Sequence, residues 1–345
     1  MGAFTSATMR AIGAPCWFPL AHAEAIAAHP DLELAALCDA NPDSLARAQA
    51  EYGVTAGYTD VEALAREVRP DLVGIATRTI DRAAIIETLF AHGTRAFHIE
   101  KPLCNSVAEL HRLEAILGRD DVFATYGAIR RYFAIYREAV ALAHSGELGE
   151  LLEVRANFGP GALYWVQPHT VDLILFAARG RAVEGVQARL VGVESGATTA
   201  IVENDPLVAA ATIWFEGGLA GHIGRAPGYE FALSCTKGEI VVRRDGWHTD
   251  LYVERPGNPY LVAERAEPGA AAVEGILAPI AQLAACLSGD ADAIAENRGH
   301  KRDILVGQAI SFAMVESHFD GSRISPLAAT NPDTIIRART NGNYA

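Results

Sequence analysis

Two stretches decide the fold: LELAALCD at residues 32–39 and DLVGIAT at residues 71–77. Both are mostly apolar and lack the strict polar alternation of a strand with one face in water. Such runs are typical of parallel strands covered by helices on both faces. We therefore expect a parallel sheet in this part of the chain.

The surrounding sequence repeats the same pattern of short apolar runs and longer amphipathic stretches. Further strands are expected at Met9–Gly13, Arg95–Ile99 and Val122–Tyr126. Helices are expected at Leu20–Ala28, Pro42–Tyr52, Asp60–Val68, Asp81–Ala91 and Val107–Leu117. This βαβ order predicts an α/β fold with a Rossmann-like, doubly wound parallel sheet, forming a dinucleotide-binding domain over residues 1–125.

The pattern changes after Tyr126, where a helix at Phe133–Ser145 precedes a series of β-type segments. Strands are expected at Leu151–Phe158, Val186–Val193, Val208–Phe215, Leu219–Arg225, Phe231–Cys235 and Glu239–Arg244. Tight connections at Glu216–Gly218 and Lys237–Gly238 indicate hairpins. The last expected elements are helices at Gly275–Leu287 and Arg302–His318, after an exposed loop at Glu264–Ala272. Residues 126–345 are thus predicted to form an α+β domain with a large open, mostly antiparallel sheet.

Length and composition exclude several classes of protein. The 345 residues are enough for two domains, and no stretch reaches the run of about 20 apolar residues that spans a bilayer. A net charge of -13 argues against nucleic-acid binding. Residues 1–10 lack a secretion signal, so we expect a cytoplasmic protein with no membrane partner. Five single cysteines argue against disulfides and against a metal site: Cys16, Cys38, Cys104, Cys235 and Cys286.

Asp39 closes the second expected strand, where a Rossmann unit places the acid that binds the ribose diol of an adenine dinucleotide. The alternative is an ordinary residue at the start of the helix that follows. Ala40 comes next, so no cation is at hand for a 2′-phosphate. The sequence therefore favours NAD over NADP.

Lys101 follows the strand that ends at Ile99 and so lies at the carboxyl edge of the sheet, where ligands of open α/β sheets bind. A lysine there can hydrogen-bond a substrate hydroxyl and help its proton leave. The alternative is a surface lysine in an ion pair. Pro102 is suited to a cis peptide bond that would aim the Lys101 side chain.

These motifs resemble the glucose-fructose oxidoreductase, inositol dehydrogenase and rhizopine-catabolism (Gfo/Idh/MocA) family over nearly the whole chain. The resemblance rests on HAEAI at residues 22–26, LCD at 37–39, EKPL at 100–103, SGELG at 145–149 and TKG at 236–238. It implies an NAD(P)-dependent dehydrogenase or reductase of sugars and polyols, with a second domain that binds substrate and mediates oligomerisation. It also implies that Lys101 orients the substrate and polarises its reacting oxygen.

The expected phosphate-binding turn departs from the family's GxGxxG pattern. Residues 13–19 read GAPCWFP, with Gly13 as the single glycine. Trp17 and Phe18 fill space that phosphates need, and the two prolines remove amide donors. Any dinucleotide would be held at Gly13, Trp17 and Phe18 in an altered geometry, or not bound.

Arginines follow the next strand, where the family commonly reads TPN. Thr77, Arg78 and Arg82 are expected beside the cofactor, together with Glu100 and Lys101. A guanidinium can grip a phosphate through two hydrogen bonds and so replace what the glycine turn lacks. The alternative is a pair of solvated arginines at the start of a helix.

The second domain carries part of the family's DxGxHxxD motif at residues 165–172, WVQPHTVD. The resemblance makes His169 the expected general base, while Trp165 replaces the first aspartate. His169 could instead be an ordinary residue at a helix start, and Asp172 is interpreted as structural. Tyr164 and Trp165 could stack on a sugar ring or be core aromatics.

Tyr126 is a further expected substrate contact, and weaker candidates are Arg130, His222 and Tyr229. We thus expect an NAD-dependent oxidoreductase that interconverts a secondary alcohol and a ketone of a sugar-like small molecule, as a homodimer or homotetramer. Two alternatives stay open. One is a catalytically silent ligand-binding regulator, and the other is an enzyme whose tightly held NAD oxidises and re-reduces one substrate.

Overall fold

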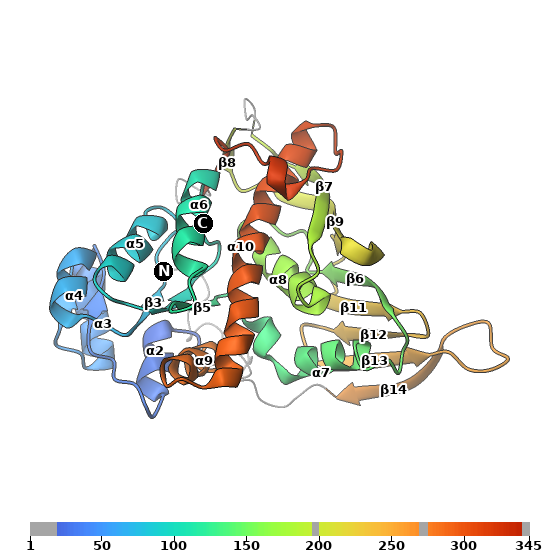
Figure 1. Ribbon diagram of the computed structural model, residues 1–345, viewed down its shortest axis with the longest axis horizontal. Helices are drawn as coiled ribbons and strands as arrows, with labels where there is room; N and C mark the ends of the chain where they lie inside the picture. The colour runs from blue at the N-terminus through green and yellow to red at the C-terminus, as the bar shows by residue number, and fades with distance from the viewer. Residues whose placement is uncertain (1–18, 195–199, 269–274, 340–345) are drawn as a thin grey trace. The chain divides into compact units, whose positions relative to one another are not determined.

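A computed structural model describes residues 19–194, 200–268 and 275–339 of the chain (Figure 1). The proximity of Cα atoms divides the chain into two compact units. The first comprises the described parts of Met1–Cys104, His111–Ile129 and Ala272–Arg302, and the second those of Asn105–Leu110, Arg130–Ala271 and Asp303–Ala345. The chain therefore passes between the units more than once, whereas the sequence predicts a single boundary after residue 125.

The first unit is built on three parallel strands: β3 (Leu72–Ile75), β4 (Ala96–Ile99) and β5 (Phe123–Tyr126). Leu72 pairs with Ala96, and Ala96 pairs with Phe123. All four residues of β4 are buried, as expected for a strand covered on both faces. The three predicted strands and their parallel order are confirmed.

A separate parallel pair joins β1 (Leu37–Cys38) to β2 (Gly57–Tyr58). The strand predicted over residues 32–39 is thus wrong in length, because only its last residues are in ladder register with a partner. The strand expected at Met9–Gly13 lies outside the described residues.

Helices cover both faces of the first sheet, which confirms the doubly wound arrangement. They are α2 (His22–Ala28), α3 (Pro42–Tyr52), α4 (Val61–Val68), α5 (Arg82–Ala91), α6 (Val107–Leu117) and α9 (Leu277–Leu287). In Figure 1, α5 lies above the strands, and α2 and α9 lie below them. Asn41 and Asp60 begin α3 and α4 by accepting hydrogen bonds from two backbone amides each.

The returning segment is part of this unit because α9 packs on β4 and β5. The long helix α10 (Ala291–Phe319) follows it and begins well before the predicted Arg302. Its first turns are polar, so they show no apolar periodicity that would predict a helix. At Arg302, α10 leaves the first unit and continues into the second without interruption.

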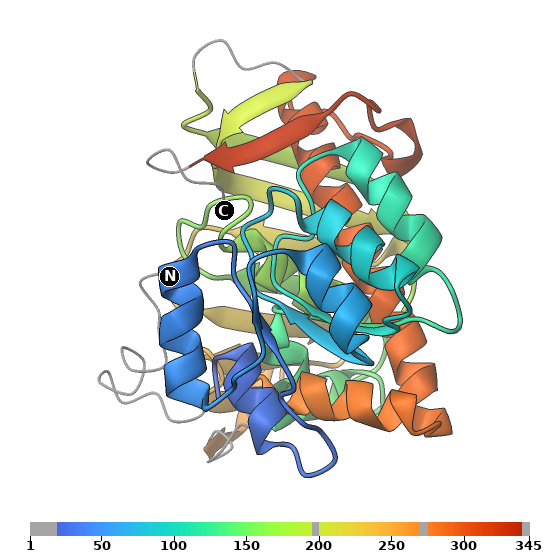
Figure 2. The same cartoon turned by 90° about the vertical axis from the view of Figure 1, so that its left-hand side faces the viewer.

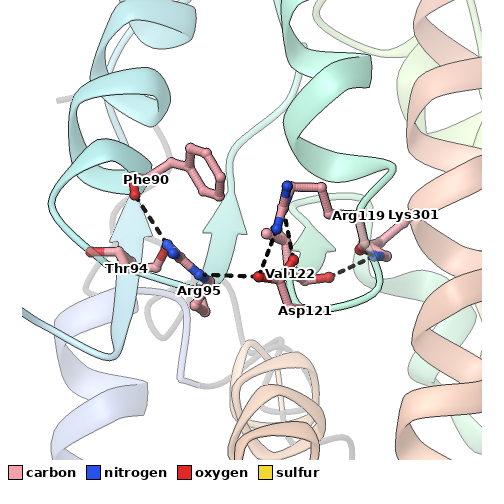
Figure 3. A network of polar contacts seen from close by, with 7 residues as sticks. All are labelled: Phe90, Thr94, Arg95, Arg119, Asp121, Val122 and Lys301. Carbon is pink, nitrogen blue, oxygen red and sulfur yellow. Dashed lines mark hydrogen bonds and ion pairs between the residues drawn. The ribbon is translucent and has the colours of Figure 1, made fainter.

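Polar contacts attach α10 to the strand side of the first unit (Figure 3). The Nζ of Lys301 donates to the carbonyl oxygens of Arg119 and Val122, each at 2.5 Å. Beside them, Arg119 pairs with Asp121 at 2.7 Å. The Arg95 guanidinium donates to the carbonyls of Phe90 and Thr94 at the end of α5. The ends of β4 and β5 that lie opposite the carboxyl edge are thereby fixed.

The second unit contains an eight-stranded sheet in the order β14-β13-β12-β11-β6-β10-β9-β7. All neighbours are antiparallel except β6 and β10, which are parallel. The strands are β6 (Leu151–Asn157), β7 (Val183–Val191), β9 (Leu207–Phe215), β10 (Ala220–Gly224), β11 (Glu230–Cys235), β12 (Gly238–Arg243), β13 (His248–Val253) and β14 (Val262–Pro268). This confirms the mostly antiparallel sheet and both predicted hairpins.

Two further helices belong to the second unit: α7 (Ala134–Ala143) and α8 (Gln167–Ala178). Helix α8 packs on β6, and α7 packs on β11 and β12. Short 3-10 turns occur at Ile129–Tyr132, Glu216–Gly218 and Leu327–Ala329. Almost every residue of α8 is buried, so the helix has no solvent-facing stripe.

Several strands escape the sequence-based prediction. The loop expected at Glu264–Ala272 is wrong for its first residues, because β14 continues to Pro268 and pairs with β13. A small parallel pair joins β8 (Ile201–Asn204) to β15 (Ile335–Arg339), which lie side by side in Figure 2. Within the described residues, no helix is long and apolar enough to cross a membrane. The same residues contain no cluster of three or more metal-ligating side chains.

Candidate active site

The segment Glu100-Lys101-Pro102 leaves β4 at the carboxyl edge of the parallel sheet. The bond between Lys101 and Pro102 is cis, as its sequence suggests. Lys101 is half-buried, and its backbone amide donates to Oε2 of Glu100 at 3.2 Å. A charged amine at this edge of an open sheet stands where ligands of this architecture bind.

Arg82 anchors this segment from beneath. Its guanidinium donates to the carbonyl oxygen of Glu100 at 2.7 Å, and also to the carbonyls of Pro102 and Thr77. The side chain is 1% exposed. Burial lowers the pKa of Arg82 to about 10, against the opposing charge of Glu100, so the group stays cationic at neutral pH. Arg82 thus fixes the backbone of this segment through its two terminal nitrogens, and a contact of its guanidinium with a cofactor phosphate stays a prediction.

Glu100 is fixed by a histidine from a distant part of the chain. Nε2 of His22, in α2, lies 3.3 Å from Oε1 of Glu100. Burial raises the pKa of Glu100, but the hydrogen bond and charge of His22, with the charge of Lys101, outweigh it and hold the pKa below its usual range. The carboxylate is ionised at neutral pH, and its negative charge attracts the Lys101 ammonium.

A second histidine completes the cluster. The rings of His22 and His98 lie 4.4 Å apart, and Nδ1 of His98 lies 2.9 Å from Oγ1 of Thr125 in β5. His98 is fully buried, and burial together with the charge of His22 lowers its pKa well below the ordinary histidine range. A Cβ at Gly127 would lie 2.7 Å from Oε2 of Glu100, so only glycine leaves room for the carboxylate there.

The expected cofactor residues that the structure describes lie along the ends of β1 and β3. Asp39 is exposed after β1, and its Oδ1 accepts a hydrogen bond from the Asn41 amide at 2.8 Å. Thr77 and Arg78 are exposed after β3. The remaining expected contacts, Gly13, Trp17 and Phe18, lie outside the described residues.

In the second unit, His169 lies in the first turn of α8 and is half-buried. Trp165, just before the helix, is 40% exposed and can stack on a ligand. Tyr164 is fully buried, and its hydroxyl accepts a hydrogen bond from Nε2 of Gln308 at 2.8 Å. Its burial fits the alternative of a core aromatic, and a contact of Tyr164 with substrate stays a prediction.

Asp172 supports α8 through a buried ion pair, in line with its structural interpretation. Nε of Arg131 lies 3.0 Å from both carboxylate oxygens of Asp172, and Nη2 lies 3.1 Å from Asp303. Burial, with the negative charge of Asp303, raises the pKa of Asp172 to about 6 against the opposing charge and hydrogen bond of Arg131. The two carboxylates outweigh the effect of burial on Arg131 and raise its pKa.

Two further candidates for substrate binding, Tyr126 and His222, lie on strands of different units. Tyr126 is 5% exposed at the end of β5. Nδ1 of His222 lies 3.1 Å from Oγ1 of Thr212 across two neighbouring strands. The sequence alone gives little sign that His22 and His98 meet at Glu100; the available signal is the histidine at position 98, inside the apolar run before Glu100.

The chain is similar to known proteins in sequence and in fold. Residues 11–127 match the model of the oxidoreductase family with an NAD-binding Rossmann fold. The trans-1,2-dihydrobenzene-1,2-diol dehydrogenase of Danio rerio is 25% identical over 167 residues, which are 44% of this chain and 50% of that protein. The chain thus matches about half the length of this curated relative.

Solved structures share the fold over most of their length. An oxidoreductase from Agrobacterium radiobacter, in complex with NAD+, L-tartaric acid and magnesium, has a TM-score of 0.68 at 19% identity and covers 89% of this chain and 94% of its own. A levoglucosan dehydrogenase in complex with NADH and levoglucosan has a TM-score of 0.65 at 17% identity, covering 85% and 90%. Both units therefore have the fold of these oxidoreductases.

Proposed function

From the match of residues 11–127 to the oxidoreductase family with an NAD-binding Rossmann fold, we propose that this chain is an NAD-dependent oxidoreductase that interconverts a secondary alcohol and the matching ketone. The proposed substrate is a sugar, a polyol or a related small molecule. The observation that carries the proposal is the placement of Lys101 at the carboxyl edge of the sheet, between Glu100 and Pro102, whose carbonyls Arg82 holds.

The residues at this edge fit an adenine dinucleotide. The exposed Asp39 carboxylate offers acceptors for the two ribose hydroxyls, and the exposed Arg78 guanidinium can pair with the pyrophosphate. Asp39 would repel a 2′-phosphate, which favours NAD over NADP. Thr77, at the end of β3, adds a hydroxyl beside Arg78.

In the proposed reaction, the Lys101 ammonium donates a hydrogen bond to the reacting oxygen and stabilises the charge that develops there. His169 takes up the hydroxyl proton on oxidation and returns it on reduction. Bound at this edge, NAD would supply the hydride acceptor for the carbon that carries the hydroxyl. Glu100 keeps the Lys101 backbone amide in place, while Trp165 and Tyr126 contribute to substrate binding.

The test measures NADH formation with a panel of polyols, sugars and a trans-dihydrodiol, which the name of the Danio rerio relative suggests. Lys101→Met should abolish turnover while NAD binding, measured by isothermal titration, persists. Lys237→Met is the matched control, because Lys237 is exposed in the hairpin between β11 and β12. Near-normal turnover of Lys101→Met would contradict the assignment.

Two other outcomes identify the alternatives. Failure of the folded protein to bind NAD, NADH, NADP or NADPH would favour the ligand-binding regulator. Substrate conversion without net NADH, with cofactor retained through purification, would favour transient oxidation by held NAD. We also expect a homodimer or homotetramer, which light scattering after size exclusion measures directly.

A further inference from the structure

The connection between β8 and β9 holds the turn that leads into α8. The amide of Leu163 donates to the carbonyl of Pro206 at 2.9 Å, and the amide of Val208 donates to the carbonyl of Gly161 at 3.0 Å. Strand β9 is itself paired with β7 and β10. The turn over residues 161–165 is therefore fastened to the eight-stranded sheet.

The carboxylate of Asp205 adds a second hold at the end of this turn. Its Oδ1 accepts a hydrogen bond from the amide of Tyr164 at 2.8 Å, and its Oδ2 accepts one from the amide of Trp165 at 3.0 Å. Each oxygen thus serves one of two successive amides. Hydrogen bonds to an ionised acceptor are stronger than those between neutral groups. An asparagine would match only one of the two amides, because its second polar atom is a donor.

The two side chains on this turn have opposite surroundings. Tyr164 is fully buried, and its hydroxyl lies 2.8 Å from Nε2 of Gln308 in α10. Trp165 is 40% exposed. The backbone that carries the indole is thus held both by the core, through Tyr164, and by Asp205. An aromatic side chain on a backbone that is already ordered loses little further freedom when a ligand packs against it.

The start of α8 depends on the same turn. Val166 stands at the N-cap position of α8, where its apolar side chain cannot accept a hydrogen bond from the helix. The amides of Val166 and Gln167 donate to the carbonyl of Ala162 at 3.0 and 3.1 Å. A Cβ at Gly161 would lie 2.7 Å from side-chain atoms of Val166 and Gln167, so the turn needs glycine there. His169 follows inside α8 and is held by the helix as well as by the turn.

We propose that Asp205 is a positioning residue that fixes the Trp165 indole for substrate binding. The proposal rests on the function proposed above, in which Trp165 contributes to substrate binding. Asp205 acts through the backbone, since both of its oxygens bind amides of the turn. Trp165 depends on this hold more than His169 does, because the backbone of His169 also belongs to α8. Loss of Asp205 should therefore weaken substrate binding more than it slows the chemical step.

Hydrogen exchange tests this hold without any need for turnover. A hydrogen-bonded backbone amide exchanges with solvent only when its bond opens. In Asp205→Ala, the amides of Tyr164 and Trp165 lose these acceptors and should exchange at least about tenfold faster. The rates are measured on the full-length protein by mass spectrometry of the peptide that spans residues 161–166. Asp205→Asn, which keeps one acceptor, should give an intermediate rate, and unchanged exchange in β9 shows that both variants stay folded.

A double-mutant cycle tests whether Asp205 acts through Trp165. The turnover probe is the member of the panel of polyols, sugars and a trans-dihydrodiol that the wild type oxidises fastest. Trp165→Ala and Asp205→Ala should each raise KM about tenfold, while kcat stays within about threefold and the Kd for NAD is unchanged. In the Trp165→Ala background, Asp205→Ala should raise KM by less than about twofold, because the side chain that Asp205 positions is gone. A purely structural role would instead give independent effects that multiply.

Glu203→Gln is the matched control for loss of a carboxylate. Glu203 precedes Asp205 in the same segment but pairs with Arg337 and Arg339. This variant should keep the exchange rates and the KM of the wild type. Unchanged exchange in Asp205→Ala, or a full effect of Asp205→Ala on KM in the Trp165→Ala background, would overturn the proposal. If the wild type oxidises no member of the panel, the proposed function fails and the exchange rates alone decide the role of Asp205.

Discussion

Nε2 of His22 lies 3.3 Å from Oε1 of Glu100, although 78 positions separate the two residues in the sequence. His22 is 7% exposed and packs tightly against Gly74. A Cβ added at Gly74 would lie 2.8 Å from the Cβ of His22, so the His22 side chain has little freedom to move. The other oxygen of Glu100 accepts the Lys101 amide. If Lys101 carries the reaction as proposed, we infer that His22 acts on it through Glu100, as a positioning residue.

Replacing His22 should weaken turnover without removing cofactor binding. His22→Ala is expected to lower kcat/KM by about tenfold, because Glu100 loses its partner and the Lys101 backbone becomes less fixed. His22→Gln can still donate a hydrogen bond and should retain more activity. His29→Gln, at the end of the same helix, is the control. Equal activity of His22→Ala and His29→Gln would exclude the positioning role.

Arg82 and Arg78 should separate stability from cofactor binding. Arg82→Met removes hydrogen bonds to three carbonyls and should lower the free energy of unfolding by about 3 kcal/mol, measured by urea denaturation. Arg78→Met should leave the urea midpoint unchanged and raise the Kd for NAD about tenfold. The assignment fails if the two variants exchange these effects.

The buried pair of Asp172 and Arg131 predicts an unusual pH dependence. The pKa of Asp172 is about 6 in the folded protein and about 3.9 in an unfolded chain, so the folded state binds this proton more tightly. This contribution to stability is complete below about pH 3.9 and is lost as the pH rises through about 6. Relative to Asp172→Asn, the wild type should gain up to about 3 kcal/mol of unfolding free energy between pH 7 and pH 4. Parallel pH curves for the two proteins would show that Asp172 does not titrate in this range.

Lys301 should stabilise the first unit through its two backbone acceptors. Lys301 is 6% exposed, and its ammonium donates to the carbonyls of Arg119 and Val122 ahead of β5. Lys301→Met leaves both oxygens without this donor and should lower the free energy of unfolding by about 3 kcal/mol. The exposed Lys237→Met should change it by less than about 0.5 kcal/mol. A similar small change in Lys301→Met would mean that water replaces the ammonium.

Sequence patterns predict the elements whose side chains alternate between core and solvent or lie wholly in the core. The apolar runs of β3 and β4 and the helix over 42–52 are of this kind. Strand β13 was missed because all its residues are partly exposed, which leaves no apolar face to detect. The first turns of α10 lack an apolar stripe for a different reason, because their buried residues are the polar Asn297, His300 and Lys301.

The sequence predicts a site residue only where a reactive side chain directly follows a recognisable strand. Lys101 follows a recognisable strand, and the edge of the sheet explains its placement. The roles of Arg82 and Tyr164 were not predictable, because their hydrogen-bond acceptors and neighbours come from separate segments. The spacing of His22, His98 and Glu100 in the sequence likewise carries no sign that they meet.

The return of residues 272–302 to the first unit affects how the protein folds during its synthesis. A ribosome releases the strands β3, β4 and β5 long before it releases α9, which covers β4 and β5. Until then, the face of β4 and β5 that α9 covers stays exposed to water. The nascent chain can avoid aggregation by staying unfolded in this region or by binding a chaperone. A fragment that stops near residue 125 should therefore aggregate, and adding the α9 segment as a separate peptide should restore its solubility.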